Sequence, residues 1–331
     1  MKKCSRKRQV CALLFLFCCL LLAGCRTGRQ PEAEGGKLKV AATVFPYYDF
    51  VRQIAGDQVE LTLVVPAGMD SHSFEPTPAD MRTLQETDLL ICNGGAMEHW
   101  LTQVLEAIDT SSMTVLTMMD YVDVVEEELV EGMEEGAHTD HADHADHDGH
   151  EMEIEYDEHI WTSPVNAMEI VKAICGGLCQ ADPEHEAAYR ENTEKYLEEL
   201  RRIHEAFQKV NADRKRDMII LGDKFPFRYL AETYDLEYRA AFSGCSSDME
   251  PSAQTIAYLI DKVKAEQIPV VYYLELSSRR VAELIGEETG AEPLLLHSCH
   301  NVTRAQFDQG ITYGELMWQN VENLRIGIAE D

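Results

Sequence analysis

The chain has 331 residues, which is enough for two domains that each bury a core of their own. It carries 29 Lys and Arg against 59 Asp and Glu, so its formal net charge is −30. This balance argues against nucleic acid as a partner and favours a cationic one.

The N-terminus is typical of an export signal. A basic region (residues 2–8) precedes the apolar run Val10–Leu22, which is too short to span a bilayer comfortably. The run ends in "LAGC", which resembles the bacterial lipobox, in which the cysteine is lipid-modified and becomes the first residue. We therefore expect a signal peptide over residues 1–24 and a lipid-anchored tether over 25–36, with the lipid on Cys25. The alternative is a plain signal peptide that happens to contain Cys25.

Short apolar runs alternate with helical stretches along the rest of the chain. The runs "LKVAATV", "VELTLVV", "DLLICN" and "MTVLTM" predict strands separated by the helices Tyr47–Ala55, Pro78–Glu86 and Trp100–Ile108. The runs "DMIILG", "EYRAAF", "VVYYLE" and "PLLLH" alternate with helices near Pro226–Tyr234, Ser252–Glu266 and Ser278–Thr289. We expect an α/β fold of two lobes with mostly parallel sheets, over residues 37–182 and 213–331.

One long helix is predicted between the lobes. Its apolar stripe consists of Tyr189, Tyr196, Leu200, Ile203, Phe207 and Val210. The helix runs from about 184 to 211, in a linking segment 183–212, and is about 40 Å long at 1.5 Å per residue. It could run behind both lobes and disfavour a large hinge closure. A coiled-coil dimer seam is the alternative, but the stripe is short, so we expect a monomer.

An acidic, histidine-rich loop (residues 126–158) belongs to the first lobe. Residues 126–159 hold fifteen acidic side chains and no Lys or Arg. Five histidines lie three residues apart, at His138, His141, His144, His147 and His150, and His159 follows nine residues later. The Asp, Ala and Gly between the five predict a disordered loop, and the five histidines predict an auxiliary metal-binding site. A solubilising acidic tract is the alternative.

Other side chains with metal-binding chemistry lie at the predicted strand ends. His72 follows "VELTLVV", Asp223 follows "DMIILG", and His297 and His300 end "PLLLH", while His159 precedes a helix start at Ser163-Pro164. Ligands of open α/β sheets bind at the carboxyl ends of the strands. Histidine and carboxylate meeting from two lobes would suit a tetrahedral zinc site.

Three motifs carry a family resemblance. "AGMDSHSFEPTP", "NGGAMEHW" and "YDEHIWTSP" resemble the zinc and manganese solute-binding lipoproteins of bacterial ABC importers, with similarity from about Leu38 to Leu324. The resemblance implies two β/α lobes joined by a backbone helix, with one metal ion in the cleft between them. It also implies delivery of the ion to an ABC permease and its ATPase. His72 and His159 match the two histidine ligands of the N-terminal lobe.

The C-terminal lobe departs from the family pattern. The third ligand usually opens a motif H-x-x-F-x-Y, and matching Phe227 and Tyr229 to it places Lys224, a poor ligand, at that position. The neighbouring Asp223 is a candidate ligand, or an acid that caps a turn or pairs with Lys224. The fourth ligand falls at His300. We expect the ligand set His72, His159 and His300, completed by Asp223 or water.

Four further residues complete the predicted site. We expect His297 to support the ligands or belong to the core, and Glu275 to orient a ligand histidine or remain a solvated acid. Five cysteines remain after removal of the signal peptide and lipidation of Cys25. We hypothesise a disulfide between Cys245 and Cys299, which each follow an apolar strand.

Function follows from these features as an expectation. An imidazole-rich site favours zinc over manganese, which prefers more oxygen ligands. We expect extracytoplasmic zinc capture for import by a protein that is lipid-anchored to the bacterial membrane and is not an enzyme. The alternatives are a manganese importer component, a metal-buffering surface adhesin, or a zinc hydrolase, although the H-E-x-x-H motif is missing.

Overall fold

The structure is a computed structural model that describes residues 36–134, 155–244 and 250–330. The described residues from Leu38 onward form one compact unit. The predicted signal peptide with Cys25, the five loop histidines 138–150, and Cys245 lie outside the described residues. Within the described part of the chain, no helix combines the length and apolarity that a membrane span requires.

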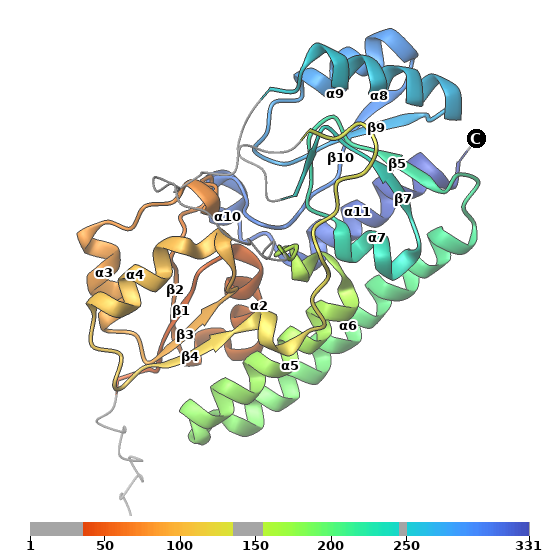
Figure 1. The fold of residues 1–331 in the computed structure, drawn as a ribbon. Coiled ribbons are helices and arrows are strands. Elements are labelled where there is room, and N and C mark those ends of the chain that lie inside the picture. The colour runs from red at the N-terminus through yellow and green to blue at the C-terminus, as the bar shows by residue number, and fades with distance from the viewer. Residues whose placement is uncertain (1–35, 135–154, 245–249, 331) are drawn as a thin grey trace, which may run out of the picture. The chain divides into compact units, whose positions relative to one another are not determined.

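The N-terminal lobe is built on a parallel sheet of order β2-β1-β3-β4, with bounds Glu60–Leu63, Lys39–Ala42, Leu89–Cys92 and Thr114–Thr117. Its helices are α2 (Phe45–Ala55), α3 (Pro78–Gln85), α4 (His99–Ala107) and α5 (Pro164–Ala181) (Figure 1). Alternate strand residues face opposite ways, so Ala42 packs in one core with α2 and α5, and Ala41 in another with α3 and α4. Both sheet faces are therefore covered, as parallel sheets require.

The C-terminal lobe contains three parallel strand pairs. They are β5 (Met218–Ile220) with β7 (Glu237–Arg239), β6 (Lys224–Phe225) with β8 (Phe242–Ser243), and β9 (Val270–Tyr273) with β10 (Glu292–Leu295). The helices are α7 (Arg228–Tyr234), α8 (Ala253–Glu266), α9 (Arg280–Thr289), α10 (Arg304–Asp308) and α11 (Tyr313–Ile328). A parallel bridge between Leu221 and Tyr272 joins the first pair to the third. The predicted α/β class with two lobes is confirmed.

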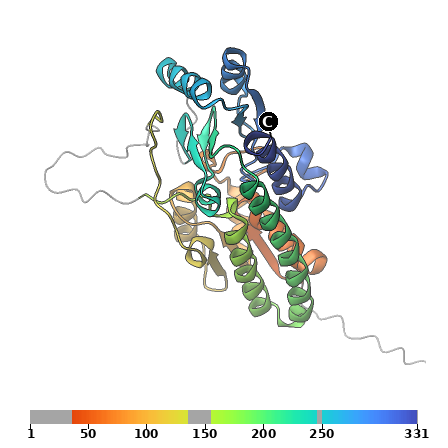
Figure 2. The same cartoon turned by 90° about the vertical axis from the view of Figure 1, so that its right-hand side faces the viewer.

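The long helix α6 (Glu186–Ala212) confirms the predicted linking helix. All six residues of the predicted stripe are buried, in a core that also contains residues of α2, α5, α7 and α11. Figure 2 shows α5 and α6 side by side along most of the length of α5. Because this stripe is buried within the chain itself, it is not available as a coiled-coil seam.

Candidate metal centre

His72 lies in a short 3₁₀ turn (Ser71–Ser73) beyond the end of β2. The turn begins at Asp70, whose Oδ1 accepts a hydrogen bond from the His72 backbone N–H at 2.7 Å. Phe74 follows the turn and packs edge-on against Trp100 at a centroid distance of 4.9 Å. The loop that carries His72 is therefore fixed at both sides of the histidine.

His159 is almost fully buried and precedes a 3₁₀ turn (Ile160–Thr162) that leads into α5. Asp157 Oδ1 accepts the His159 backbone N–H at 2.8 Å and lies 3.3 Å from His159 Nδ1. Burial lowers the pKa of His159, but the carboxylates of Asp157, Glu127 and Glu158 together raise it, and the net pKa is raised. A carboxylate at Nδ1 leaves Nε2 as the nitrogen that can bind a metal.

The "NGGAMEHW" segment holds the loop that carries His159 through hydrogen bonds to Glu158. The buried Glu158 carboxylate accepts hydrogen bonds from the backbone N–H groups of Ala96 and Met97. Asn93 Nδ2 donates to the Glu158 carbonyl at 3.0 Å, and Glu98 Oε2 accepts from Asn93 N at 2.9 Å. Burial raises the pKa of Glu98 and of Glu158 to about 7. These contacts give the motif a positioning role.

His300 lies in the loop after β10, and residues of both lobes hold this loop. Ser298 Oγ accepts the His300 backbone N–H at 3.2 Å, and Trp161 Nε1 donates to Ser298 O at 2.8 Å. The His300 ring shares a close hydrogen bond between its Nε2 and Ser71 Oγ. The ring is thus held beside the turn that carries His72.

A second tether joins the two ligand loops. The buried Asn301 Nδ2 donates to the carbonyl oxygens of Pro66 at 2.9 Å and Met69 at 2.6 Å. Pro66 and Met69 belong to the loop that leads to His72. Asp157 and Trp161 lie inside the motif "YDEHIWTSP" and Asn301 directly follows His300, but no sequence pattern marked these three residues as part of the site.

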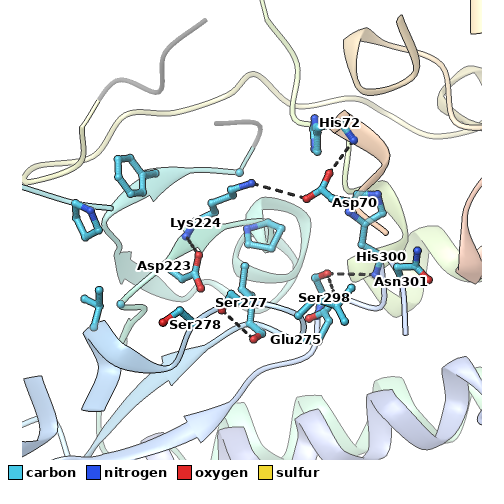
Figure 3. A pocket seen from close by; sticks show the side chains of 18 of the residues that line it. Asp70, His72, Asp223, Lys224, Glu275, Ser277, Ser278, Ser298, His300 and Asn301 are labelled. Carbon is cyan, nitrogen blue, oxygen red and sulfur yellow. Dashed lines mark hydrogen bonds and ion pairs between the residues drawn. The ribbon is translucent and has the colours of Figure 1, made fainter. Parts of the chain in front are cut away.

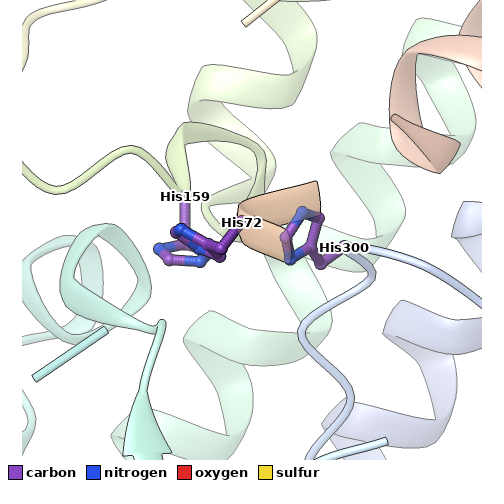
Figure 4. A group of neighbouring side chains, drawn as sticks. All are labelled: His72, His159 and His300. Carbon is purple, nitrogen blue, oxygen red and sulfur yellow. The ribbon is translucent and has the colours of Figure 1, made fainter. Parts of the chain in front are cut away.

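The structure brings His72, His159 and His300 together. One ligand nitrogen of each ring lies within 4.8 Å of those of the other two, and the ring centroids are 5.7 to 6.1 Å apart (Figure 4). Burial, followed by the neighbouring His159 and His72, holds the pKa of His300 well below its usual value. A neutral imidazole is the form that binds a metal, so the cluster suits an ion that prefers nitrogen ligands.

Asp223 does not join this cluster in the structure, and the expectation that Asp223 or water completes the ligand set stays a prediction. Asp223 Oδ1 accepts the Lys224 backbone N–H at 2.8 Å, as the alternative turn-capping role requires. The Lys224 side chain points toward the His72 turn instead, and its Nζ lies 3.9 Å from Asp70 Oδ2 (Figure 3). Among the described residues, no Asp, Glu or Cys joins the three histidines.

Glu275 and His297 support the His300 loop from the core side. Glu275 Oε2 accepts the Ser298 backbone N–H at 2.8 Å, and Oε1 lies 3.5 Å from His297 Nδ1. The expected contact of Glu275 with a ligand histidine is therefore replaced by contacts with Ser298 and His297. His297 is buried, Nδ1 accepts the Cys299 backbone N–H at 3.0 Å, and burial lowers its pKa.

Only Cys299 of the predicted Cys245–Cys299 pair lies within the described residues, so the disulfide stays a prediction. The Cys299 thiol is free and completely buried, and its Sγ lies 3.7 Å from the His297 carbonyl oxygen. Cys245 lies outside the described residues. A strand-end position in the sequence therefore did not place the Cys299 sulfur at the surface, because its side chain turns into the core.

The three histidines line a cleft of about 710 Å³. Its lining comes from both lobes and includes Asp70, Lys224, Phe242, Ser277, Leu284 and Asn301. The cleft therefore opens at the carboxyl ends of strands from both lobes, as the topology of parallel sheets predicts.

Comparisons with known proteins agree with the resemblance. The model of the family described as zinc-uptake complex component A, periplasmic, matches residues 40–327. The high-affinity zinc uptake system protein ZnuA of Bacillus subtilis is 30% identical over 311 residues, which cover 93% of this chain and 94% of that protein. The zinc-binding lipoprotein AdcA of Streptococcus pneumoniae is 29% identical over 96% of this chain, which spans 60% of AdcA.

Two solved structures share the fold. The metal-dependent lipoprotein YcdH of Bacillus subtilis has a TM-score of 0.72 at 27% identity, with 88% of this chain and 100% of that chain covered. The Zn(II)-bound ZnuA-like domain of Streptococcus pneumoniae AdcA has a TM-score of 0.71 at 26% identity, with 89% and 100% covered. The match to the family model spans most of the chain and contains the three histidines, so the chain belongs to the zinc-uptake complex component A family.

Proposed function

We propose that this protein captures zinc outside the cytoplasm and delivers it to an ABC permease. The observation that carries the proposal is the convergence of His72, His159 and His300 within one cleft. Relatives over nearly the whole chain are named for zinc uptake or zinc binding, and two structural neighbours, both of Streptococcus pneumoniae AdcA, are Zn(II)-bound. Their names support a role in binding and uptake over a catalytic one.

Zinc is favoured over manganese by the donor set. Three imidazole nitrogens and no carboxylate, among the described residues, form the cluster. Zinc accepts such a set in a tetrahedral arrangement, whereas manganese prefers carboxylate and water oxygens. In the proposal, a water or another exogenous ligand takes the fourth position.

Lipid anchoring at Cys25 belongs to the same proposal. The "LAGC" sequence places a lipid-modified cysteine at the start of the mature chain, and residues 25–36 tether the lobes to the membrane surface. We also propose that the protein acts as a monomer, because the apolar stripe of α6 is buried in the core of the same chain and does not form a dimer seam.

Zinc titration of the full chain tests the proposal. The five loop histidines at 138–150 are first changed to alanine, so that the loop cannot mask the cleft. We expect one tight equivalent of zinc, which is lost in His159→Ala. In cells, deletion of the gene should impair growth only when zinc is scarce. Tight binding that survives His159→Ala would refute the assignment of the site.

A further inference from the structure

The cleft is much larger than a metal ion needs. A water molecule occupies about 30 Å³ of liquid volume, whereas the cleft measures about 710 Å³. Pockets for small organic ligands measure roughly 300 to 1,000 Å³. Most of the cleft therefore stays available after a zinc ion has bound to the three histidines.

The walls of this remaining space resemble those of a small-molecule pocket. Its lining residues include the apolar Phe242, Ile256 and Leu284 and the hydroxyl-bearing Ser277 and Ser278, together with charged residues of both signs, namely Asp70, Asp223, Glu250, Glu275, Lys224 and Arg280. Pockets of this kind combine apolar walls with a few polar groups that orient the ligand. A bare ion would not contact the apolar walls.

A cation lies beside the metal cluster on the same lining. The Lys224 side chain is only 13% exposed, and its Nζ lies 3.9 Å from Asp70 Oδ2 at the His72 turn. Figure 3 shows the Lys224 side chain directed at Asp70, which lies next to His72. Lys224 is therefore close enough to interact with a group bound at the metal.

The donor set leaves a place for an anion. Three neutral imidazoles would fill three of the four positions of a tetrahedral zinc ion. The fourth position then stays open, and no ligand compensates the double positive charge of the ion. The nearby carboxylates make other contacts, since Asp223 accepts from Lys224 N and Asp70 from His72 N. A carboxylate ligand would complete the coordination and pair with the Lys224 ammonium group.

We propose that the cleft binds the metal together with a small carboxylate anion, which takes the fourth coordination position and is held by Lys224. The anion replaces a bound water, and its apolar part lies against Phe242 and Leu284. This inference rests on the proposed metal capture and specifies the form in which the metal is carried. A lone water or chloride would complete the coordination but would leave the apolar walls uncovered.

Cobalt(II) in place of zinc provides the test, because its visible spectrum changes when a ligand of a tetrahedral site is exchanged. The full chain with the five loop histidines changed to alanine is loaded with one equivalent of cobalt. Acetate is then titrated, with acetamide as the neutral isostere and chloride as the simple anion. We expect a saturable spectral change with acetate, none with acetamide, and a weaker one with chloride.

Two variants locate the anion. Lys224→Met should keep one equivalent of cobalt but lower the affinity for acetate by about tenfold or more, as loss of a charge-assisted hydrogen bond predicts. Arg280→Met is the matched control, because Arg280 lines the same cleft but is 78% exposed and faces Glu250 at 3.4 Å. It should bind acetate as before.

The outcomes separate this inference from the proposed function. Bound cobalt with a spectrum that does not respond to acetate would overturn the inference and leave metal capture intact. An equal response to chloride, with the same dependence on Lys224, would also overturn the carboxylate assignment. If the chain holds neither zinc nor cobalt tightly, the proposed function fails and the inference fails with it.

Discussion

Asp157 Oδ1 contacts His159 twice, at 2.8 Å from its backbone nitrogen and at 3.3 Å from Nδ1 of its ring. One carboxylate thus fixes both the position of the residue and the orientation of its imidazole. Carboxylates of this kind keep Nε2 directed at a metal and raise the basicity of the ligand.

Asp157→Asn should therefore weaken zinc binding without removing a ligand. We expect a loss of about 10- to 100-fold in affinity, the usual effect of removing such a partner. Competition with a chelating dye, on the chain whose loop histidines are alanines, measures it. The exposed Asp57→Asn serves as the control, and equal affinities of the two variants would show that Asp157 has no role at the metal.

The three clustered histidines and His297 should respond differently to alanine. His72→Ala, His159→Ala and His300→Ala should each lower zinc affinity by more than about 100-fold, because each removes a ligand and not just its support. His297→Ala should mainly lower the free energy of unfolding, by about 1 to 3 kcal/mol, because the buried Cys299 N–H loses its acceptor. Chemical denaturation and zinc competition on the same samples distinguish the two effects. Full affinity in His300→Ala would remove His300 from the site.

The sequence was sufficient to predict the parts of the fold that follow from local periodicity. The stripe of α6 and the eight principal strands repeat with the periods of helix and strand, and both are present. His72 and His300 could also be placed in one ligand set, although they follow strands of two different sheets, because each lies at the carboxyl end of its strand, where ligands of α/β sheets bind, and because the family resemblance implies both as ligands. Helices α10 and α11 and the short strand β6 were not predicted.

Side-chain directions within loops could not be predicted in the same way. A one-residue shift in the match to the family motif decides whether Asp223 or Lys224 is expected to face the histidines. In the structure, the Lys224 side chain is directed toward Asp70. The tether from Asn301 to Pro66 joins residues 235 positions apart. No local pattern encodes such a contact, because it depends on how the two lobes pack.

Zinc affinity should fall in two steps as the pH is lowered. The pKa of His159 is raised above its usual value of about 6.5. Protonated His159 therefore stabilises the metal-free folded protein at low pH. This stabilisation is lost as the pH rises through the pKa of His159 in the folded protein. Zinc competes with that proton, so affinity should begin to fall above pH 6.5 as pH is lowered. His300, with its depressed pKa, should add a second fall only at lower pH.

Asp157→Asn provides the control for this profile, because Asp157 is the main cause that raises the pKa of His159. The first fall in affinity should therefore move to lower pH in the variant. Zinc competition measured at half-unit steps from pH 8 to pH 5 resolves the shift. A profile that is flat over this range in the parent chain would contradict a histidine site.

The histidine loop should bind metal independently of the cleft. Its five histidines, changed together to alanine, should lower the total zinc stoichiometry but leave one tight equivalent. Elemental analysis after dialysis gives the stoichiometry, and competition gives the affinity. Loss of the tight equivalent together with the loop histidines would show that the loop and the cleft form one site.

Asp223→Asn decides the remaining ligand position. The amide keeps an oxygen that can accept the Lys224 backbone N–H, so we expect the free energy of unfolding to change by less than about 1 kcal/mol. Zinc affinity should also stay within about twofold of the parent, because Asp223 lies outside the histidine cluster. A twofold change corresponds to less than about 0.5 kcal/mol. Asp157→Asn, the same substitution at a residue that contacts His159, supplies the matched positive control. A large loss of affinity in Asp223→Asn, with stability unchanged, would mean that Asp223 leaves its turn to bind the metal, and the fourth position would then belong to the protein and not to an exogenous anion.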